Sequence, residues 1–217
     1  IDKYVRDEDT EFPRDKKKEI TELLYNHNQL RSQEEFDEIK NKLHVAIQNG
    51  DLELIKIYLS ETIEDESKNL KFKINKTKKT ASLFKIDNEQ IKELIIPRTI
   101  KQESDEYLIT SICWLGDSIY SHTNNIKTIK FTEDSSVSTL YSNSLSFSTI
   151  EEIYFPKSLK ELKEGWCKDT RNLKKIIISP FNDQFLFKDN KYLLGKSDKN
   201  SDEFDNLIFV NRCLRKI

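Results

Sequence analysis

Two neighbouring stretches of the chain repeat one pattern of apolar and polar positions. Each begins with an apolar residue and has further apolar residues at its fourth and sixth positions, first from Ile126 and again from Ile150. These starting points lie 24 residues apart, and a third copy begins 23 residues later, at Leu173. Periods of roughly 20 to 50 residues are typical of stacked repeat architectures. The pattern therefore predicts consecutive copies that stack on one another.

Each copy is expected to contain a short strand with one inward face. Successive side chains of a strand point to opposite sides of the sheet, so Ile129 and Phe131 turn to the core. One strand from each copy then contributes to a single parallel sheet. The side chains between the core positions form its outer face, which is the candidate binding surface: Thr128, Lys130, Thr132, Glu152, Tyr154, Lys175, Ile177 and Ser179.

Insertions interrupt the copies on either side of this region. One copy starts near residue 91, and the tip of its insertion is expected at Gln102–Glu106. A last copy starts near residue 214, after an inserted meander of strands within residues 184–210. The repeats proper therefore extend over most of the second half of the chain.

A hairpin is predicted over residues 70–90, where two runs of alternating apolar residues flank a polar turn. We expect it to cap the first open edge of the repeat stack, with which it forms one region, residues 70–217. Residues 63–69 are charged and form the predicted linker to a helical region over residues 1–62.

Apolar residues recur at helical spacing within these first 62 positions. A second helix is expected to begin at Ser32, with Glu35 completing a capping box. Asn49-Gly50 ends it, and Asp51 caps a third helix. The apolar face of this third helix is Leu52, Leu54, Ile55, Tyr58 and Leu59.

Leu43-His44-Val45-Ala46, followed by Gly50 and Ile55, resembles the ankyrin repeat. The resemblance covers about residues 14–61, and Asn41-Lys42 stands where that repeat usually has Thr-Pro. It implies paired helices joined by tight turns. A generic helical bundle is the alternative for this region.

The string Ile150-Glu-Glu-Ile-Tyr-Phe-Pro, continued by Trp166-Cys167, resembles the BspA-type leucine-rich repeat. The resemblance covers about residues 70–217, with Thr132 in the first copy where Pro is usual. It implies an α/β fold: a leucine-rich-repeat solenoid with one short parallel strand per repeat, here preceded by the ankyrin-like helical region. Members of this family are associated with adhesion or protein binding, and no catalytic residues carry over.

Composition excludes several classes of function. The 217 residues contain 36 Lys and Arg against 38 Asp and Glu, so no overall basic field favours nucleic acid. No apolar run approaches the ~20 residues of a membrane span. The chain contains no methionine, and we expect it to be an internal segment of a longer protein.

No arrangement of residues predicts catalysis, a cofactor or a metal. The histidines and cysteines lack ligand or catalytic spacing, and reduced, buried thiols are expected. Asp198-x-Asn200-x-Asp202 begins like a calcium loop, but Glu203 and Phe209 replace the required Gly and acid. The residues considered for such roles are His27, His44, His122, Cys113, Cys167 and Cys213.

Two surface features remain. Five lysines between residues 71 and 79 could contact phosphates, but lysines also protect an exposed strand edge, and we favour this second interpretation. Asn75-Lys76-Thr77 is a glycosylation sequon.

These observations predict a non-catalytic protein-protein interaction module that uses the exposed strand face. We expect a cytoplasmic scaffold or adaptor with protein partners and no nucleic acid. The alternative is a cell-surface adhesin that binds host or matrix macromolecules.

Overall fold

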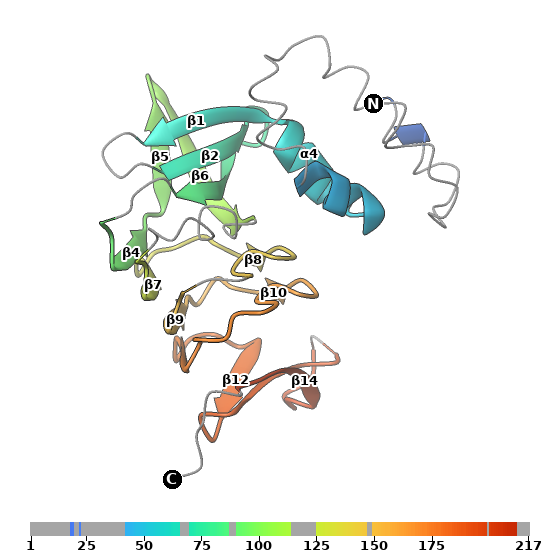
Figure 1. The fold of residues 1–217 in the computed structure, drawn as a ribbon, viewed down its shortest axis with the longest axis vertical. Helices are drawn as coiled ribbons and strands as arrows, with labels where there is room; N and C mark the ends of the chain where they lie inside the picture. Colours follow the sequence, from blue (N-terminus) through green and yellow to red (C-terminus); the bar gives the residue numbers. More distant parts are fainter. Residues whose placement is uncertain are drawn as a thin grey trace.

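The computed structural model describes residues 18–19, 22, 42–65, 70–86, 90–113, 125–146, 149–198 and 200–211. Its elements follow one another along the long axis of the molecule (Figure 1). Helix α4 (Leu52–Leu59) and the first strands lie at one end, and strands β12–β14 lie at the other. The candidate repeats occupy the middle.

Four short strands, one from each of four copies, form a parallel sheet in the order β11-β9-β7-β4. The register places Leu94 beside Ile129 and Ile153 beside Ile176, and all four are buried. One apolar row therefore runs through the sheet, as expected from the copies near 91, 126, 150 and 173. The strands are β4 (Glu93–Ile96), β7 (Thr128–Phe131), β9 (Glu152–Phe155) and β11 (Lys175–Ile178).

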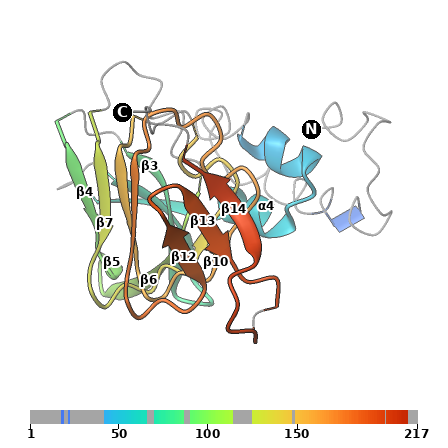
Figure 2. The same cartoon turned by 90° about the horizontal axis from the view of Figure 1, so that it is seen from below.

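The second half of each of the first three copies returns through another sheet, which lies opposite the first when the molecule is seen from below (Figure 2). Its strands run in the order β1-β2-β3-β6-β8-β10, and β5 also pairs with β6. Strands β3, β6, β8 and β10 are parallel. The bounds are β1 (Glu61–Asp65), β2 (Leu70–Asn75), β3 (Thr80–Ile86), β5 (Thr99–Gln102), β6 (Asp105–Ile112), β8 (Thr139–Leu140) and β10 (Glu161–Leu162).

Each copy adds one short parallel strand beside the previous one, and the two copies without an insertion span 24 and 23 residues. This arrangement is of the leucine-rich-repeat type. The core between the two sheets contains the apolar row and side chains from the returning segments. Among the latter, Val137, Leu140, Leu145, Leu159 and Trp166 are buried. The copy expected near residue 214 lies outside the described residues.

Both insertions have the predicted form. β5 and β6 pair antiparallel around the tip, where Glu103 has a φ of 55°. The meander consists of β12 (Phe185–Lys188), β13 (Tyr192–Gly195) and β14 (Asn206–Val210), also antiparallel. Its residues Phe185 and Leu193 are buried in the same core as the repeats.

The hairpin predicted over residues 70–90 is present as antiparallel β2 and β3, with residues 87–89 outside the described part. It extends only the second sheet, through the parallel pairing of β3 with β6. No described strand pairs with the outer edge of β4 in the first sheet. The expected cap therefore covers one of the two sheets.

The predicted linker over residues 63–69 is wrong for residues 63–65, because β1 (Glu61–Asp65) is a strand that pairs with β2. Ile63 is buried in the core, while Glu61 turns outward and its carboxylate lies 2.6 Å from the Lys76 ammonium. The sequence predicted that the lysines of β2 protect an open strand edge. This prediction is wrong, because β1 pairs with that edge of β2. Residues 66–69 lie outside the described part.

In the helical region, the structure describes helical residues 18–19, 22 and 42–48, and α4. Gly50 has a φ of 65°, and Asp51 Oδ1 accepts a hydrogen bond from the Leu54 N–H at 3.0 Å, which confirms the predicted cap. The buried side chains of α4 include Leu54 and Tyr58, and they pack with Phe84 and Cys113. The Ser32 capping box lies outside the described residues, and the ankyrin-like arrangement stays a prediction. No described helix is long and apolar enough to cross a membrane.

Candidate binding surface

The outer face of the four-stranded sheet presents side chains in rows that cross the strands. The register aligns Ile95 with Lys130 and Tyr154 with Ile177. The Lys130 ammonium lies 5.2 Å from the centre of the Tyr154 ring, which joins these pairs into one central row. The exposed fraction of the Ile95 side chain is 48%. The row thus offers apolar and aromatic surface on β4, β9 and β11, with Lys130 between them on β7.

A row of polar side chains runs beside this central row. It consists of Glu93, Thr128, Glu152 and Lys175, aligned by the same register. The Lys130 ammonium lies 2.6 Å from the Glu93 carboxylate, and the Lys175 ammonium lies 4.0 Å from that of Glu152. The hydrogen bond to Glu93 raises the pKa of Lys130. Charges on this face are therefore matched within the sheet.

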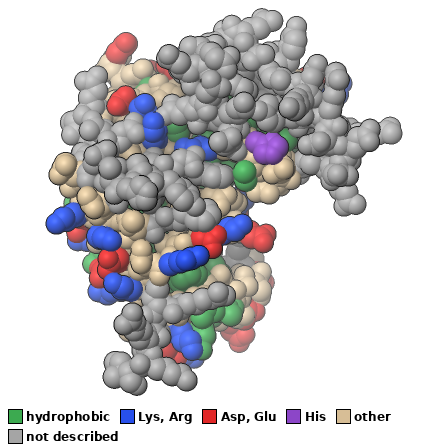
Figure 3. Space-filling view, viewed as in Figure 1, with side chains coloured by type: hydrophobic (Ala, Val, Ile, Leu, Met, Phe, Trp, Pro, Cys, Tyr) green, Lys and Arg blue, Asp and Glu red, His purple; other side chains and the backbone are tan. Residues whose placement is uncertain are grey.

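A second set of paired charges borders the strands where they begin. Glu151 lies 2.7 Å from the Lys174 ammonium and 3.2 Å from that of Lys127. The hydrogen bonds from Lys174 and Lys127 lower the pKa of the Glu151 carboxyl. Basic and acidic side chains alternate along this side of the molecule (Figure 3). Such exposed pairs contribute little to stability, but they leave no strong field of either sign.

The other two residues of the predicted surface, Thr132 and Ser179, lie just beyond the ends of β7 and β11. The Thr132 hydroxyl oxygen is buried, so it offers no donor at the surface. The Ser179 hydroxyl accepts a hydrogen bond from the Phe181 N–H at 3.3 Å. The structure therefore brings together six of the eight predicted residues: Thr128, Lys130, Glu152, Tyr154, Lys175 and Ile177.

Two members of the rows, Glu93 and Ile95, were absent from the predicted surface. Both belong to β4, in the copy that starts near residue 91. The sequence held a signal for them, because Ile95 stands between two core positions in that copy, as Lys130 and Tyr154 do in theirs. The longer insertion in this copy obscured the equivalence.

The remaining candidates for chemistry are two buried thiols, the half-buried His44 in the helical residues 42–48, an exposed turn, and residues outside the described part. Burial raises the pKa of the Cys113 and Cys167 thiols to about 12 each, so both stay protonated at neutral pH. Within the part of the chain that the structure describes, no group of three or more His, Cys, Asp or Glu could hold a metal ion. Asp198 Oδ1 accepts from the Asn200 N–H at 2.9 Å in an exposed turn. His27, His122 and Cys213 lie outside the described residues.

No protein-family model matches the chain, and no curated protein matches it. Among solved structures, the pneumococcal vaccine antigen PcpA is 17% identical with a TM-score of 0.40 over 57% of this chain and 39% of its own. A leucine-rich cell surface protein from Faecalibacterium prausnitzii A2-165 is 12% identical with a TM-score of 0.24 over 63% of this chain and 59% of its own. The chain thus spans less than two thirds of either matched structure.

Proposed function

We propose that the chain is a BspA-type leucine-rich-repeat solenoid that binds another protein, without catalysis, through the outer face of β4, β7, β9 and β11. The observation that carries this proposal is the central row of Ile95, Lys130, Tyr154 and Ile177. The strand register aligns its outer pairs, and the contact of Lys130 with the Tyr154 ring joins them. The chain acts in the cell as a scaffold or adaptor.

The composition of this face supports a protein partner. Protein interfaces combine an apolar or aromatic centre with a polar rim, and Tyr is enriched among the residues that dominate binding energy. Tyr154 lies in the central row of the face, and the neighbouring row of Glu93, Thr128, Glu152 and Lys175 forms its polar rim. Lys130, within the central row, is paired with Glu93 of that rim. Nucleic acid would require unpaired cations, since phosphate neutralisation dominates its affinity.

The finer family assignments rest on particular residues. Pro156 follows β9 and is buried, as are Trp166 and Cys167 in the return segment of the same copy. These are the positions that carry the resemblance to the BspA-type repeat. For the ankyrin-like part, the support is the buried Leu43 and Ala46 before the turn at Gly50.

Site-specific photo-cross-linking tests this function. With Tyr154 replaced by p-benzoylphenylalanine in the full-length protein, we expect cross-links to a discrete protein in the cells that produce it. The matched control places the same group at Lys160, which is exposed next to β10 on the return side. Absence of a cross-link from position 154, or the same products from both positions, would contradict the proposal.

A cell-surface adhesin is the second candidate, and one observation favours it. Asn75 of the sequon is exposed at the end of β2, where a glycan could be attached. The free thiols of Cys113 and Cys167 favour the intracellular role instead.

Protease accessibility of the epitope-tagged, full-length protein separates these locations. We expect protection on intact cells, digestion only after permeabilisation, and no change in mobility upon treatment with a glycosidase. Digestion on intact cells, together with a glycan that disappears in Asn75→Gln, would establish the adhesin instead.

A further inference from the structure

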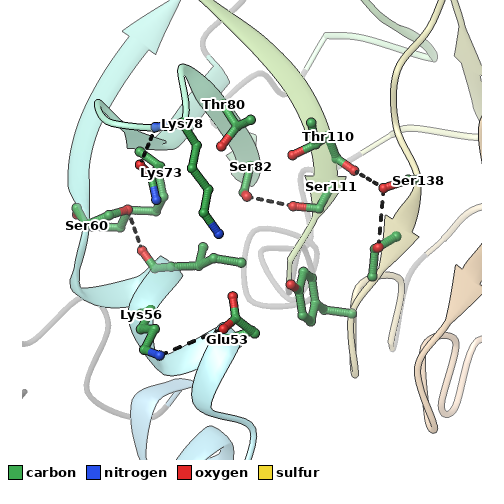
Figure 4. A pocket seen from close by; sticks show the side chains of 14 residues that line it. Glu53, Lys56, Ser60, Lys73, Lys78, Thr80, Ser82, Thr110, Ser111 and Ser138 are labelled. Atoms are coloured by element: carbon green, nitrogen blue, oxygen red, sulfur yellow. Dashed lines mark hydrogen bonds and ion pairs between the residues drawn. The ribbon is translucent and has the colours of Figure 1, made fainter.

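A polar pocket lies between α4 and the second sheet, away from the candidate binding surface (Figure 4). Its volume is about 250 Å³, slightly below the roughly 300 to 1,000 Å³ of sites for drug-sized ligands. Side chains from α4, β2, β3, β6 and β8 meet there, together with the turn after β2. The pocket therefore suits a small chemical group rather than an extended segment.

Hydroxyl groups dominate the lining, and Ile57 is the single aliphatic hydrophobic residue among the lining residues. The register of three strands aligns Ser82, Ser111 and Thr139 into one row along its wall. The hydroxyl oxygens of Ser82 and Ser111 lie 2.6 Å apart. A ligand with several acceptor oxygens would find many donors here.

Basic side chains outnumber acidic ones in the lining, which contains three lysines and one carboxylate, that of Glu53. The lysines are Lys56, Lys73 and Lys78. The Lys73 side chain is only 3% exposed, and its ammonium donates to Thr62 Oγ1 at 2.7 Å and to the Ser60 carbonyl at 3.3 Å. Lys56 is paired with Glu19 at 3.0 Å and with Glu53 at 3.8 Å. Lys73 thus contributes a nearly buried side-chain nitrogen to the lining of the pocket.

Lys78 differs from its neighbours in the same turn. Lys76 is paired with Glu61 at 2.6 Å, and Lys79 with Asp105 at 2.8 Å. The Lys78 side chain instead reaches into the pocket, and no carboxylate of the described residues lies within ion-pair distance of its ammonium. The backbone N–H of Lys78 donates to Asn75 Oδ1 at 2.8 Å. This hydrogen bond stabilises the turn from which the Lys78 side chain extends into the pocket.

Tyr141 adds a neutral donor to the opposite wall. Burial, together with nearby groups that include Asp51 and Glu53, raises the pKa of its phenol above the ordinary value. The phenol therefore keeps its proton and can donate a hydrogen bond at neutral pH. Ammonium groups, hydroxyls and a phenol together form a donor set that matches a tetrahedral oxyanion.

We propose that this pocket binds the phosphate or sulfate monoester group of a ligand, with Lys78 as the principal contact. Lys73 supplies a second side-chain nitrogen in the lining, and the hydroxyls of Thr110, Thr139 and Tyr141 supply further donors. The site is separate from the outer face of β4, β7, β9 and β11, so it stands or fails independently of the protein-binding role.

Calorimetric titration with O-phospho-L-serine and with inorganic sulfate, at constant ionic strength and neutral pH, tests the site. We expect saturable binding that Lys78→Gln weakens about tenfold, since a charge-assisted hydrogen bond is lost. Thr110→Val, which keeps the side-chain shape, should weaken it as well. The control is Lys101→Gln, an exposed lysine on β5, which should leave the affinity unchanged.

The pH dependence of the affinity distinguishes the binding of a phosphate monoester from the binding of sulfate. A phosphate monoester gains its second charge above about pH 6, so binding of O-phospho-L-serine should strengthen as the pH rises to neutrality, while sulfate binding should not. The unfolding temperature of each variant shows whether the fold is kept, and it should stay unchanged for Lys78→Gln. The proposal is overturned if neither anion saturates, if glucose binds instead, or if folded Lys78→Gln binds as well as the parent protein.

Discussion

Replacing Ile153 with aspartate should abolish the cooperative thermal unfolding of the repeat region. Ile153 is 0% exposed and is paired in register between Ile129 and Ile176, both of which are buried. An ionised carboxylate there has no polar partner in the row, and such burial costs several kcal/mol. Because domains of this size are stable by only about 5–15 kcal/mol, most of the stability is lost. Near-ultraviolet circular dichroism and thermal scans measure the effect.

The neighbouring residue provides the control. Tyr154 follows Ile153 on the same strand but points outward, and it contacts Lys130 on the half-exposed outer face of the sheet. Such a contact contributes about 0.5–1 kcal/mol at exposed sites, so Tyr154→Ala should lower the unfolding temperature by only a few degrees. Equal effects of the two substitutions would mean that the inward and outward faces of β9 are assigned wrongly.

Phe155→Ala is expected to destabilise the protein by about 3–5 kcal/mol, the usual range for a buried Phe. Its ring lies edge-on to Trp166, with centres 5.7 Å apart, and edge-on to Phe185 at 5.9 Å. Trp166 in turn contacts Phe209 at 6.1 Å. These rings join β9 to β12 and β14 of the meander. Urea unfolding should report the loss, and hydrogen exchange should rise most in β12–β14.

An exposed aromatic side chain in the same part of the chain serves as the comparison. Phe181 is 81% exposed in the loop that follows β11. Phe181→Ala should therefore change the free energy of unfolding by no more than about 0.5 kcal/mol. If Phe155→Ala were equally mild, the aromatic contacts between the repeats and the meander would not hold the two together.

The repeat could be predicted from the sequence because stacked copies require apolar residues at recurring positions along the chain. Each copy places an apolar residue against its equivalent in the previous copy, as Ile153 stands against Ile129. The spacing of such residues must then recur along the chain, and the same spacing fixes which side chains face outward. The inserted meander was recognisable for a similar reason, since short apolar runs alternate with polar turns.

Strand β1 could not be predicted in this way. Its sequence, Glu61–Asp65, is charged, and only Ile63 is buried. The segment is a strand because β2 offers it a pairing edge, and because the buried Lys73 donates to Thr62 Oγ1. Both causes are tertiary and leave no local periodicity. Composition alone therefore indicated a linker.

The two candidate sites differ in the same way: the outer sheet face could be predicted from the sequence, and the pocket beside α4 could not. The rows on the outer sheet face follow from the repeat, and six predicted residues lie there together. The pocket beside α4 is assembled from segments as distant as Glu53 and Tyr141. Only the turn after β2 drew attention in the sequence, as a cluster of lysines. The structure separates these lysines into Lys76 and Lys79, which are paired, and Lys78, which reaches into the pocket.

The most direct test of the protein-binding role is the dissociation constant of the partner that cross-links to position 154. It should be measured for the parent protein, for Tyr154→Ala, for Ile95→Ser and for Lys160→Ala. We predict that the first two substitutions weaken binding at least about tenfold, since central aromatic and apolar residues dominate interface energies, while Lys160→Ala has no effect and all variants stay folded. Unchanged affinity of folded Tyr154→Ala and Ile95→Ser would contradict a binding role for the outer sheet face.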